Sequence, residues 1–566
     1  NVNSGSFAVG QAYPLFSWTS GSAPAVTLGT LTGAGGNLTT NGNTIRLNIT
    51  SLAYVWRGNT DGNWDTTTAN NWFLSGVSAI YSEPAVALFD DTSTGETNVV
   101  LNAPVAPVST TVNSSAKIYS ITSSGANLIG GSGGLTKNGS TTLTLAGGVN
   151  TYSGATAISG GTVSVGTLAN GGAASDIGAA NNTAASLVLN GGTLQYTGSG
   201  ATSDRLFTLG TGNGAVDASG SGALALGNAG SVGLSGSGAR TLTLAGTDVN
   251  DNTLAASLGD NGGATAVTKS GAGKWVLTGN NTYSGATTIA GGTLQVGVGG
   301  ASGSLGSGNI LNNGVLVFNT SSTLTNGTIS GTGSVTKDGT GKVVLPGDNS
   351  YAGQTTITAG TLQVGNGGAT GKLNSTAPVV NDGTFIFDST GSFTMSGGGG
   401  ITGTGNVIVR GAGNLFQALG ANTYTGWTLI EPGATFQPAQ GNQGSLASSV
   451  VTNNGTFKLV RQDNGVFIYA GNVVGTGLVL VDANNVNNGD VTLAGTNTYT
   501  GGTIIANNTL VLGDGATPGA GTIVGGILFT NSLTPNENPR RVAFNDPADL
   551  TFSGLITFAP TLPFGN

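Results

Sequence analysis

The chain has 566 residues, of which 16 are basic and 24 acidic, so that charged side chains make up only 7% of it. A net charge of -8 argues against a nucleic-acid partner, because neutralising phosphates requires clustered Lys and Arg. The absence of Cys and His excludes disulfides, the usual zinc and copper sites, and nucleophiles activated by histidine. We therefore expect no cofactor, and without a run of 18 apolar residues we expect no membrane span.

Residues 1–116 differ from the rest of the chain and are predicted to form an atypical N-terminal β segment, either a cap or an assembly region. They contain four of the six tryptophans. Trp56, Trp64 and Trp72 are spaced by eight residues, and such large rings commonly close the end of a hydrophobic stack. Packing is therefore the favoured interpretation. The alternative is that the three rings contact a ligand, such as a sugar, or a neighbouring subunit.

The segment between Asp61 and Asp65 has the alternating oxygen ligands of a calcium loop. Asp61, Asn63 and Asp65 would bind the metal. A calcium loop of this type requires glycine where Thr66 stands, and a later glutamate that is missing. We therefore favour a turn in which Asp and Asn side chains bond the backbone, and predict no metal site.

One phrase with a central tyrosine recurs along the chain. Its copies read VNTYSGATAISGGTVSVG (149–166), NNTYSGATTIAGGTLQVG (280–297), DNSYAGQTTITAGTLQVG (348–365), ANTYTGWTLIEPGATFQP (421–438) and TNTYTGGTIIANNTLVLG (496–513). The last three steps between the tyrosines are 68, 73 and 75 residues. Two other phrases recur at a nearly constant distance from it, with copies that read NNGVLVF (312–318) and GTGSVTKDGTGKVVL (331–345). A fixed phase predicts one stacked architecture over residues 117–530.

The repeated phrase has the local pattern of short β-strands. Within 274–296 we predict strands at Lys274–Leu277, Ala286–Ile289 and Thr293–Val296, each rich in Thr, Val, Ile or Leu and bounded by turn residues. Three strands in about 23 residues match one coil, and a period near 70 residues is then about three coils. The predicted fold class is all-β: a right-handed parallel β-helix, or β-solenoid, with about three strands per coil.

A lysine recurs at one place of the repeat, at Lys137, Lys269 and Lys337. We expect these lysines at a solvated corner of the coil. Like charges three coils apart lie beyond a Debye length and barely repel each other there.

The string VTKSGAGKWVLTGNNTYSGATTIAGGTLQVG (267–297) resembles the autotransporter-associated β-strand repeat, also called the passenger-associated transport repeat. The resemblance spans most of 117–515. In addition, VWRGNTDGNWDTTTANNWF (55–73) looks like a stretch found upstream of such repeats, and residues 13–50 look like the stretch that closes them. The resemblance implies a β-helical stalk on a bacterial surface or in bacterial secretions.

Residues 531–566 are predicted to form a proline-rich C-terminal cap or assembly segment. Its prolines are Pro535, Pro539, Pro547, Pro560 and Pro563. Proline is confined to the edges and ends of sheets. A terminal cap is one interpretation. The other is a segment that pairs with residues 1–50 of the next subunit, because open β-helix ends present unpaired edges and a contact that does not close makes a filament.

β-Helices also carry polysaccharide lyases and hydrolases, and glycoside hydrolysis needs two carboxyl groups at a defined separation. Asp90 and Asp91 are adjacent, so in a strand they point to opposite faces. Asp248, Asp251 and Asp260 are interpreted as solvated loop acids. We therefore predict no catalytic residue.

Together these features predict a non-enzymatic extracellular protein of a bacterial surface, a β-solenoid stalk or fibre subunit that assembles head-to-tail with copies of itself. A first alternative is a surface adhesin or glycan-binding passenger that displays the tryptophan-rich region. A second is a polysaccharide-active β-helix enzyme. The expected partners are the chain itself and cell-surface or matrix glycans.

Overall fold

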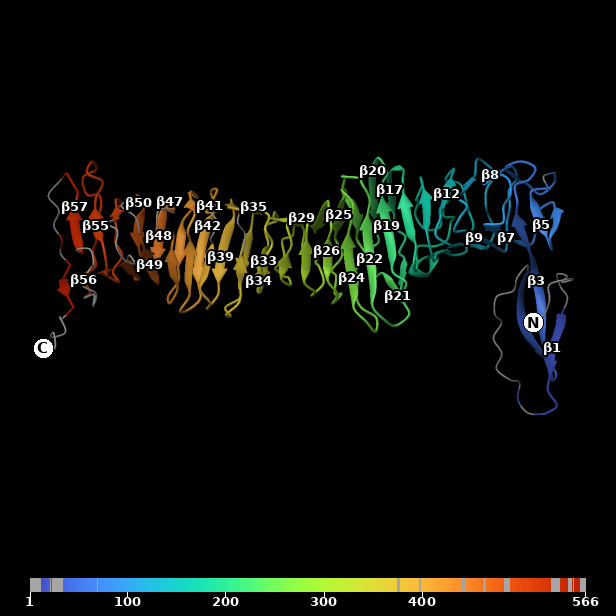
Figure 1. Ribbon diagram of the computed structural model, residues 1–566, viewed down its shortest axis with the longest axis horizontal. Helices are drawn as coiled ribbons and strands as arrows, with labels where there is room; N and C mark the ends of the chain where they lie inside the picture. The colour runs from blue at the N-terminus through green and yellow to red at the C-terminus, as the bar shows by residue number, and fades with distance from the viewer. Residues whose placement is uncertain are drawn as a thin grey trace. The chain divides into compact units, whose positions relative to one another are not determined.

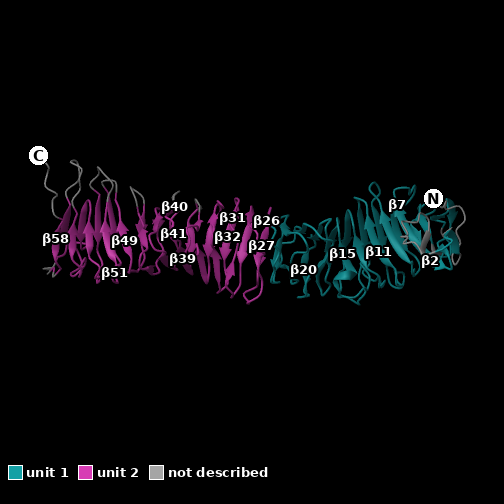
Figure 2. Cartoon of the chain, turned by 90° about the horizontal axis from the view of Figure 1, so that it is seen from below, with its two compact units in different colours: residues 1–285 teal, residues 286–566 magenta. Residues whose placement is uncertain are grey.

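The computed structural model describes residues 12–20, 22, 34–68, 70–373, 377–395, 399–439, 444–461, 465–482, 489–530, 540–547, 552 and 554–559. The chain divides into two compact units, Asn1–Gly285 and Ala286–Asn566, coloured separately in Figure 2. In each unit short strands of successive coils pair in parallel and build long sheets. Among the described residues the one helical element is a 3-10 turn, η1 (Ala184–Ser186). The predicted all-β parallel β-solenoid is confirmed, with two or three strands in each coil.

Three sheets run along the first unit. The first sheet contains β3 (Thr44–Trp56), β7 (Ala85–Asp90), β9 (Ser109–Asn113), β11 (Gly134–Asn138), β13 (Thr156–Ile158), β15 (Leu187–Leu189), β18 (Thr208–Gly210) and β21 (Gly233–Ser235). The second contains β4 (Asn63–Trp64), β8 (Asn98–Leu101), β10 (Tyr119–Thr122), β12 (Thr142–Ala146), β14 (Thr162–Val165), β16 (Thr193–Tyr196), β19 (Gly214–Ala218), β22 (Arg240–Ala245) and β24 (Thr265–Lys269). The third contains β17 (Ser199–Ser203), β20 (Gly222–Leu226), β23 (Asn252–Leu254) and β25 (Lys274–Leu277).

The N-terminal segment departs from parallel pairing. Strands β1 (Ala12–Ser17) and β2 (Ala34–Asn41) both run antiparallel to the first part of β3. The last part of β3 enters the solenoid, where it pairs in parallel with β7 and antiparallel with β5 (Trp72–Leu74), which in turn pairs with β6 (Val77–Ala79). The long strand β3 therefore links the antiparallel strands to the first coil, as can be followed in Figure 1.

The second unit continues the same construction with more sheets. One set of paired strands contains β26 (Thr287–Ile289), β28 (Ile310–Asn312) and β31 (Ile329–Ser330). A second set contains β27 (Thr293–Val296), β29 (Val315–Phe318), β32 (Ser334–Lys337), β35 (Thr355–Ile357), β38 (Val379–Asn381) and β41 (Ile401–Thr402). The next holds β30 (Leu324–Thr325), β33 (Lys342–Leu345), β36 (Thr361–Val364), β39 (Thr384–Asp388), β42 (Asn406–Arg410), β45 (Thr428–Ile430), β48 (Val450–Asn453) and β51 (Asn472–Val474). Strands β39, β42 and β48 are labelled in Figure 1.

The remaining strands of the second unit form two larger and two small sheets. One larger sheet contains β40 (Phe393–Met395), β43 (Leu415–Ala418), β46 (Thr435–Gln437), β49 (Thr456–Leu459), β52 (Leu478–Val481), β54 (Thr503–Ile505), β56 (Ile527–Phe529) and β58 (Ile556–Phe558). The other larger sheet contains β50 (Val466–Tyr469), β53 (Asp490–Leu493), β55 (Thr509–Leu512) and β57 (Arg541–Phe544). The small ones pair β34 (Asp348–Asn349) with β37 (Lys372–Leu373), and β44 (Ala421–Asn422) with β47 (Ser445–Leu446).

The predicted strands lie where the sequence placed them, but their grouping into one coil is wrong. Strands β25 and β27 have the predicted bounds, and β26 begins one residue later than predicted. In the equivalent copy, the first and last strands, β33 and β36, stack on each other through the pair Val343↔Leu362. The third strand of the phrase therefore begins the next coil. The reason is that the tyrosine-bearing connection crosses one side of the coil without a long strand.

The repeat period is three coils plus one further side of the coil. Equivalent strands of successive copies therefore do not stack on one another. From β27, parallel pairing passes through β29 and β32 to β35, which takes three steps. The strand equivalent to β35 in the preceding copy is β26, which lies on a different sheet from β27. The equivalent strands β26, β35, β45 and β54 lie on four different sheets. Successive copies of the phrase in this unit consequently present their outward side chains from different faces.

The asparagine of the phrase binds its coil to the coil before it, and the tyrosine makes a buried bond within its own coil. The asparagine Oδ1 atom accepts a backbone N–H from the preceding coil in every copy: Ile129 to Asn150 (3.0 Å), Leu258 to Asn281 (2.8 Å), Ile329 to Asn349 (2.9 Å), Ile401 to Asn422 (3.0 Å) and Val473 to Asn497 (2.9 Å). The hydroxyl groups of Tyr351 and Thr355 are 2.7 Å apart, with equivalent pairs in three other copies. These buried bonds explain why the tyrosine marks the period.

Replacing one of these asparagines should weaken its coil specifically. In Asn422→Ala, the N–H of Ile401 loses its acceptor and three carbonyls lose the Nδ2 donor of a fully buried side chain. We expect a local loss of about 2 kcal/mol, because buried polar groups are left unpaired. Hydrogen exchange followed by mass spectrometry should show faster exchange around Ile401. The exposed control Gln354→Ala should leave exchange unchanged, and equal exchange in both variants would contradict the role of Asn422.

Candidate functional site

The N-terminal tryptophans form the centre of an aromatic cluster. Trp56, Trp64 and Trp72 each have an exposed fraction of 0%. Trp72 meets Trp56 edge to face at 5.0 Å between ring centroids and Trp64 at 5.1 Å, and Tyr81 and Phe89 pack against them. The N–H of Trp56 donates to the carbonyl of Glu96 (2.7 Å). With no ring face at the surface, these three side chains give a sugar nothing to stack on, and the cluster fills the first coils.

The candidate calcium ligands are instead occupied by donors of the protein. Asp61 accepts hydrogen bonds from the backbone N–H of Asn63 (2.9 Å) and the Nδ2 atom of Asn71 (2.6 Å), and these bonds lower its pKa. Asp65 accepts the backbone N–H groups of Thr67 (3.0 Å) and Thr68 (2.9 Å). Both carboxylates thus organise turns. Among the described residues, no three acidic side chains gather as a metal site would require.

The acids Asp248, Asp251 and Asp260 have separate structural roles. Asp251 pairs with Lys274 at 2.6 Å, and Asp260 accepts the backbone N–H of Thr265 (2.7 Å). The expectation that Asp248 is a solvated loop acid is wrong, because only 6% of it is exposed. It is buried because its Oδ1 atom closes a tight turn, accepting both the backbone N–H (3.2 Å) and the Nδ2 atom (2.6 Å) of Asn250.

The repeated lysines are buried, which corrects the prediction of a solvated corner. The exposed fractions of Lys137, Lys269 and Lys337 are 0%, 0% and 1%. The alternation of the strand explains this: Lys137 lies on the same side of β11 as the buried Leu135, two residues away. Its Nζ atom reaches the inner side of a corner and donates to the carbonyls of Asn138 (2.7 Å) and Gly139 (3.0 Å). Each ammonium group therefore caps backbone carbonyls.

Burial lowers the pKa of these lysines, to about 8 for Lys137 and Lys269, because the charged form loses hydration. The pKa of Lys337 is lowered for the same reason. Gly360, with φ of +67°, makes room for the corner at Lys337: a Cβ atom there would lie 2.8 Å from the Nζ atom and 2.4 Å from the carbonyl oxygen of Gly341. The corner thus depends on both the glycine and the lysine.

Two buried arginines that were not among the predicted site residues cap carbonyls in the same way. Arg205 donates to the carbonyls of Ala169 (2.9 Å), Ala180 (3.0 Å) and Gly178 (2.8 Å), among others. Arg240 likewise donates to several backbone carbonyls, including that of Leu209 (2.9 Å). Both side chains are 2% exposed. No clear signal in the sequence marked them, because Asp204 directly precedes Arg205 and makes an exposed ion pair the simpler expectation.

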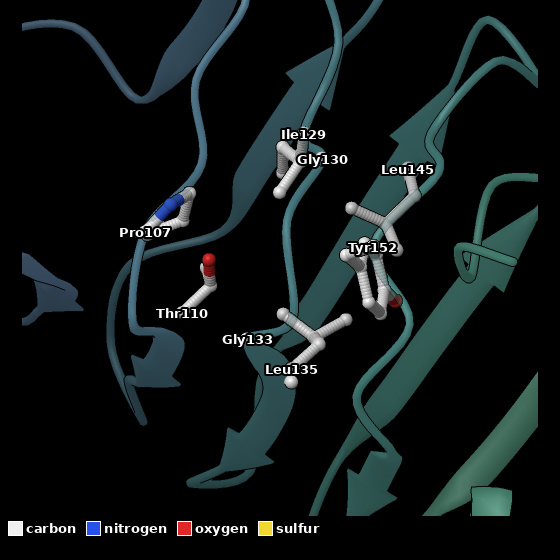
Figure 3. Close-up of a pocket in the computed structure, with 9 residues that line it drawn as sticks. Pro107, Thr110, Ile129, Gly130, Gly133, Leu135, Leu145 and Tyr152 are labelled. Atoms are coloured by element: carbon white, nitrogen blue, oxygen red, sulfur yellow. The ribbon is translucent and has the colours of Figure 1, made fainter. Parts of the chain in front are cut away.

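Two spaces lined by described residues are candidates for a ligand site. Figure 3 shows a gap in the first unit that is too narrow to hold a water molecule. It is lined by Pro107, Thr110, Ile129, Gly130, Gly133, Gly134, Leu135, Leu145 and Tyr152. An open depression of about 370 Å³ in the second unit is lined in part by Asp348, Lys372 and Phe393. Among its described lining residues Asp348 is the one carboxylate, whereas glycoside hydrolysis needs two.

A phrase that closes one coil onto the previous coil, repeated through stacked parallel strands, defines a β-solenoid built from a single sequence repeat. The family model described as the passenger-associated-transport-repeat matches residues 135–165, 267–296, 335–364 and 487–512. The chain carries passenger-associated transport repeats, as the resemblance of its sequence predicted.

One curated relative is the Adhesin BmaC autotransporter of Brucella suis biovar 1 (strain 1330). This chain is 47% identical to it over 175 residues. The alignment covers 30% of this chain and 5% of the relative's length. The comparison with solved structures found no match.

Among the described residues, no helix combines the length and the hydropathy of a membrane-spanning segment.

The buried lysines should make stability depend on pH in a defined window. Between the folded pKa of about 8 and the unfolded value of 10.5, the unfolded chain binds a proton that folded Lys269 has released. The free energy of unfolding should therefore rise with pH across this window. Lys269→Met should reduce the rise, measured as the difference in thermal midpoint between pH 7 and pH 9.5 by circular dichroism. Lys372→Met, at a half-exposed lysine, is the control; an undiminished rise in Lys269→Met would refute the assignment.

Proposed function

We propose that this chain is a non-enzymatic stalk segment of a bacterial surface or secreted passenger protein. The observation that carries the proposal is that the buried asparagine of every copy of the phrase bonds the preceding coil, while apolar side chains fill the interior. Such a coil depends only on its neighbours, so length can be built by repetition. The passenger-associated transport repeats and the similarity to an autotransporter adhesin support the location outside the cell.

A stalk should tolerate the loss of one full period. Deleting residues 288–355 removes 68 residues and joins Thr287 to Thr356, which are consecutive positions of equivalent copies. Because each coil needs only its neighbours, we expect an unchanged strand content and a particle shorter by about 16 Å, the height of about three and one-third coils at the strand spacing. Small-angle scattering and circular dichroism measure both. A deletion of 57 residues, 288–344, joins Thr287 to Leu345, a non-equivalent position of the repeat, and is the out-of-phase control that should lose strand content. Loss of structure in the in-phase variant would contradict the stalk model.

Head-to-tail assembly is a further proposal for the same chain. Residues 1–11, 23–33, 531–539 and 560–566, which contain much of the expected contact, lie outside the described residues. In the described part, Phe544, Ile556 and Phe558 of β57 and β58 are 50%, 45% and 70% exposed. Their partners one coil earlier are buried or half-buried, so these positions can accept another coil. We propose that residues 1–50 of a second copy provide it.

Electron microscopy of the purified chain tests this assembly. The full chain should form filaments, and the variant without residues 1–50 should remain as single particles, because the edge would lack its partner strands. Circular dichroism of the shortened variant controls for folding. Filaments that persist without residues 1–50, or a full chain that stays monomeric at high concentration, would show that the contact model is wrong while leaving the stalk proposal standing.

A further inference from the structure

Trp427 is the most exposed tryptophan of the chain, and Trp18 is intermediate. It is 38% exposed, whereas Trp56, Trp64, Trp72 and Trp275 are 0% exposed. It directly precedes β45 on the outer side of the solenoid, because the next residue, Thr428, is buried. A single exposed ring is ordinary by itself, so the argument rests on what surrounds Trp427.

The outward side chains of three neighbouring strands surround Trp427. Val407 pairs with Thr428, so Asn406 lies beside Trp427, while Ile408 pairs with Leu429. On the other side Thr428 pairs with Val451, which places Val450 next to Trp427. We call the set formed by Asn406, Ile408, Arg410, Trp427, Leu429, Glu431 and Val450 the Trp427 platform. It combines an aromatic and aliphatic surface with an amide and an ion pair at its margins.

Other copies of the repeat show that the coil does not need this tryptophan. The equivalent positions are occupied by Ala155, Ala286, Gln354 and Gly502. Copies with alanine, glutamine or glycine there still form the buried Tyr–Thr hydroxyl pair, at 2.8 Å for Tyr152, 2.7 Å for Tyr351 and 2.5 Å for Tyr499. The coil does not need Glu431 either, because the equivalent positions of other copies carry small residues such as Ser159 and Ala506. The platform is therefore an addition to the coil.

The polar groups at the margin are held in place. The backbone N–H of Trp427 donates to the Oδ1 atom of Asn406 (3.1 Å), which leaves the Nδ2 group of that amide as the donor on the outer side. Arg410 and Glu431 are 2.8 Å apart, and each side chain is about one-third exposed, at 32% and 33%. Asp388 lies next to Arg410 on β39. Positive charge on the platform is thus fully compensated by carboxylates.

We propose that the Trp427 platform binds a neutral saccharide unit. The electron-rich face of an indole ring attracts the C–H face of a pyranose, and fixed amide and charged groups bind its hydroxyl groups. The neighbouring carboxylates disfavour acidic sugars. The size of the platform supports this choice: three strands about 4.8 Å apart and five residues long offer roughly 200 Å². A stable protein partner needs about 800 Å² on each side. The proposal concerns a site on the coil and does not depend on the stalk function.

Saturation-transfer NMR with the full chain tests the proposal. The probes are four neutral disaccharides, chitobiose, cellobiose, lactose and mannobiose, with digalacturonic acid as the acidic comparison. We expect at least one neutral disaccharide to bind, and Trp427→Ala to weaken its affinity about tenfold or more. Because two other copies carry alanine at this position, Trp427→Ala should retain the circular dichroism spectrum and thermal midpoint of the parent.

Gln354→Ala, which places alanine at the equivalent position of another copy, should bind like the parent chain and serves as the matched control. Binding by none of the neutral disaccharides, or equal binding by Trp427→Ala, would overturn the proposal. Sedimentation velocity tests the alternative that a second copy of the chain occupies the platform. If Trp427→Ala dissociates a self-associated form while no disaccharide binds the parent, the platform is a contact between copies and the saccharide assignment is wrong.

Discussion

Parallel stacking at the spacing of a β-sheet is the constraint on which the rest of this structure depends. Each coil must offer its backbone groups to the next coil and fill the space below it, so inward positions are restricted while outward positions are not. Polar residues enter the interior only where they serve that stacking. Asn422 bridges two coils through its amide, and Lys137 and Arg205 cap carbonyls where corners leave them without strand partners.

The capping cations also account for an unusual feature of the composition. Charge is rare in this chain, yet three lysines and two arginines of the part that the structure describes are almost completely buried. A buried cation is unfavourable unless it is well bonded, and here the bonds come from backbone carbonyls in place of carboxylates. Carbonyl groups at a corner point in different directions and cannot all reach a strand partner. A long side chain with several donors satisfies them together, at the cost of a lowered lysine pKa.

Much of the fold was predictable because it is encoded locally and repeatedly. The bounds of β25 and β27 followed from strand pattern and turn residues, and the tyrosine period indicated a stack. The grouping of strands into coils was not predictable, since it depends on how far the tyrosine-bearing connection travels without a strand. The burial of Lys137 was signalled by its alternation with Leu135, but the preference of lysine for solvent outweighed that signal. At the N-terminal site, spacing favoured packing of Trp56, Trp64 and Trp72, which are buried.

Trp427 illustrates why the candidate site was harder to find than the fold. In the sequence it is one letter within a phrase whose regularity suggests a purely structural role. Only the structure shows that Trp427 occupies an outward position. It lies beside outward residues of two neighbouring coils, and those residues belong to different phrases of the repeat. The period of three coils and one face matters here, because it prevents equivalent outward positions of successive copies from stacking on one face. A binding platform must therefore be assembled from unlike parts of the repeat, and variation at a single outward residue suffices to create one without disturbing the stack.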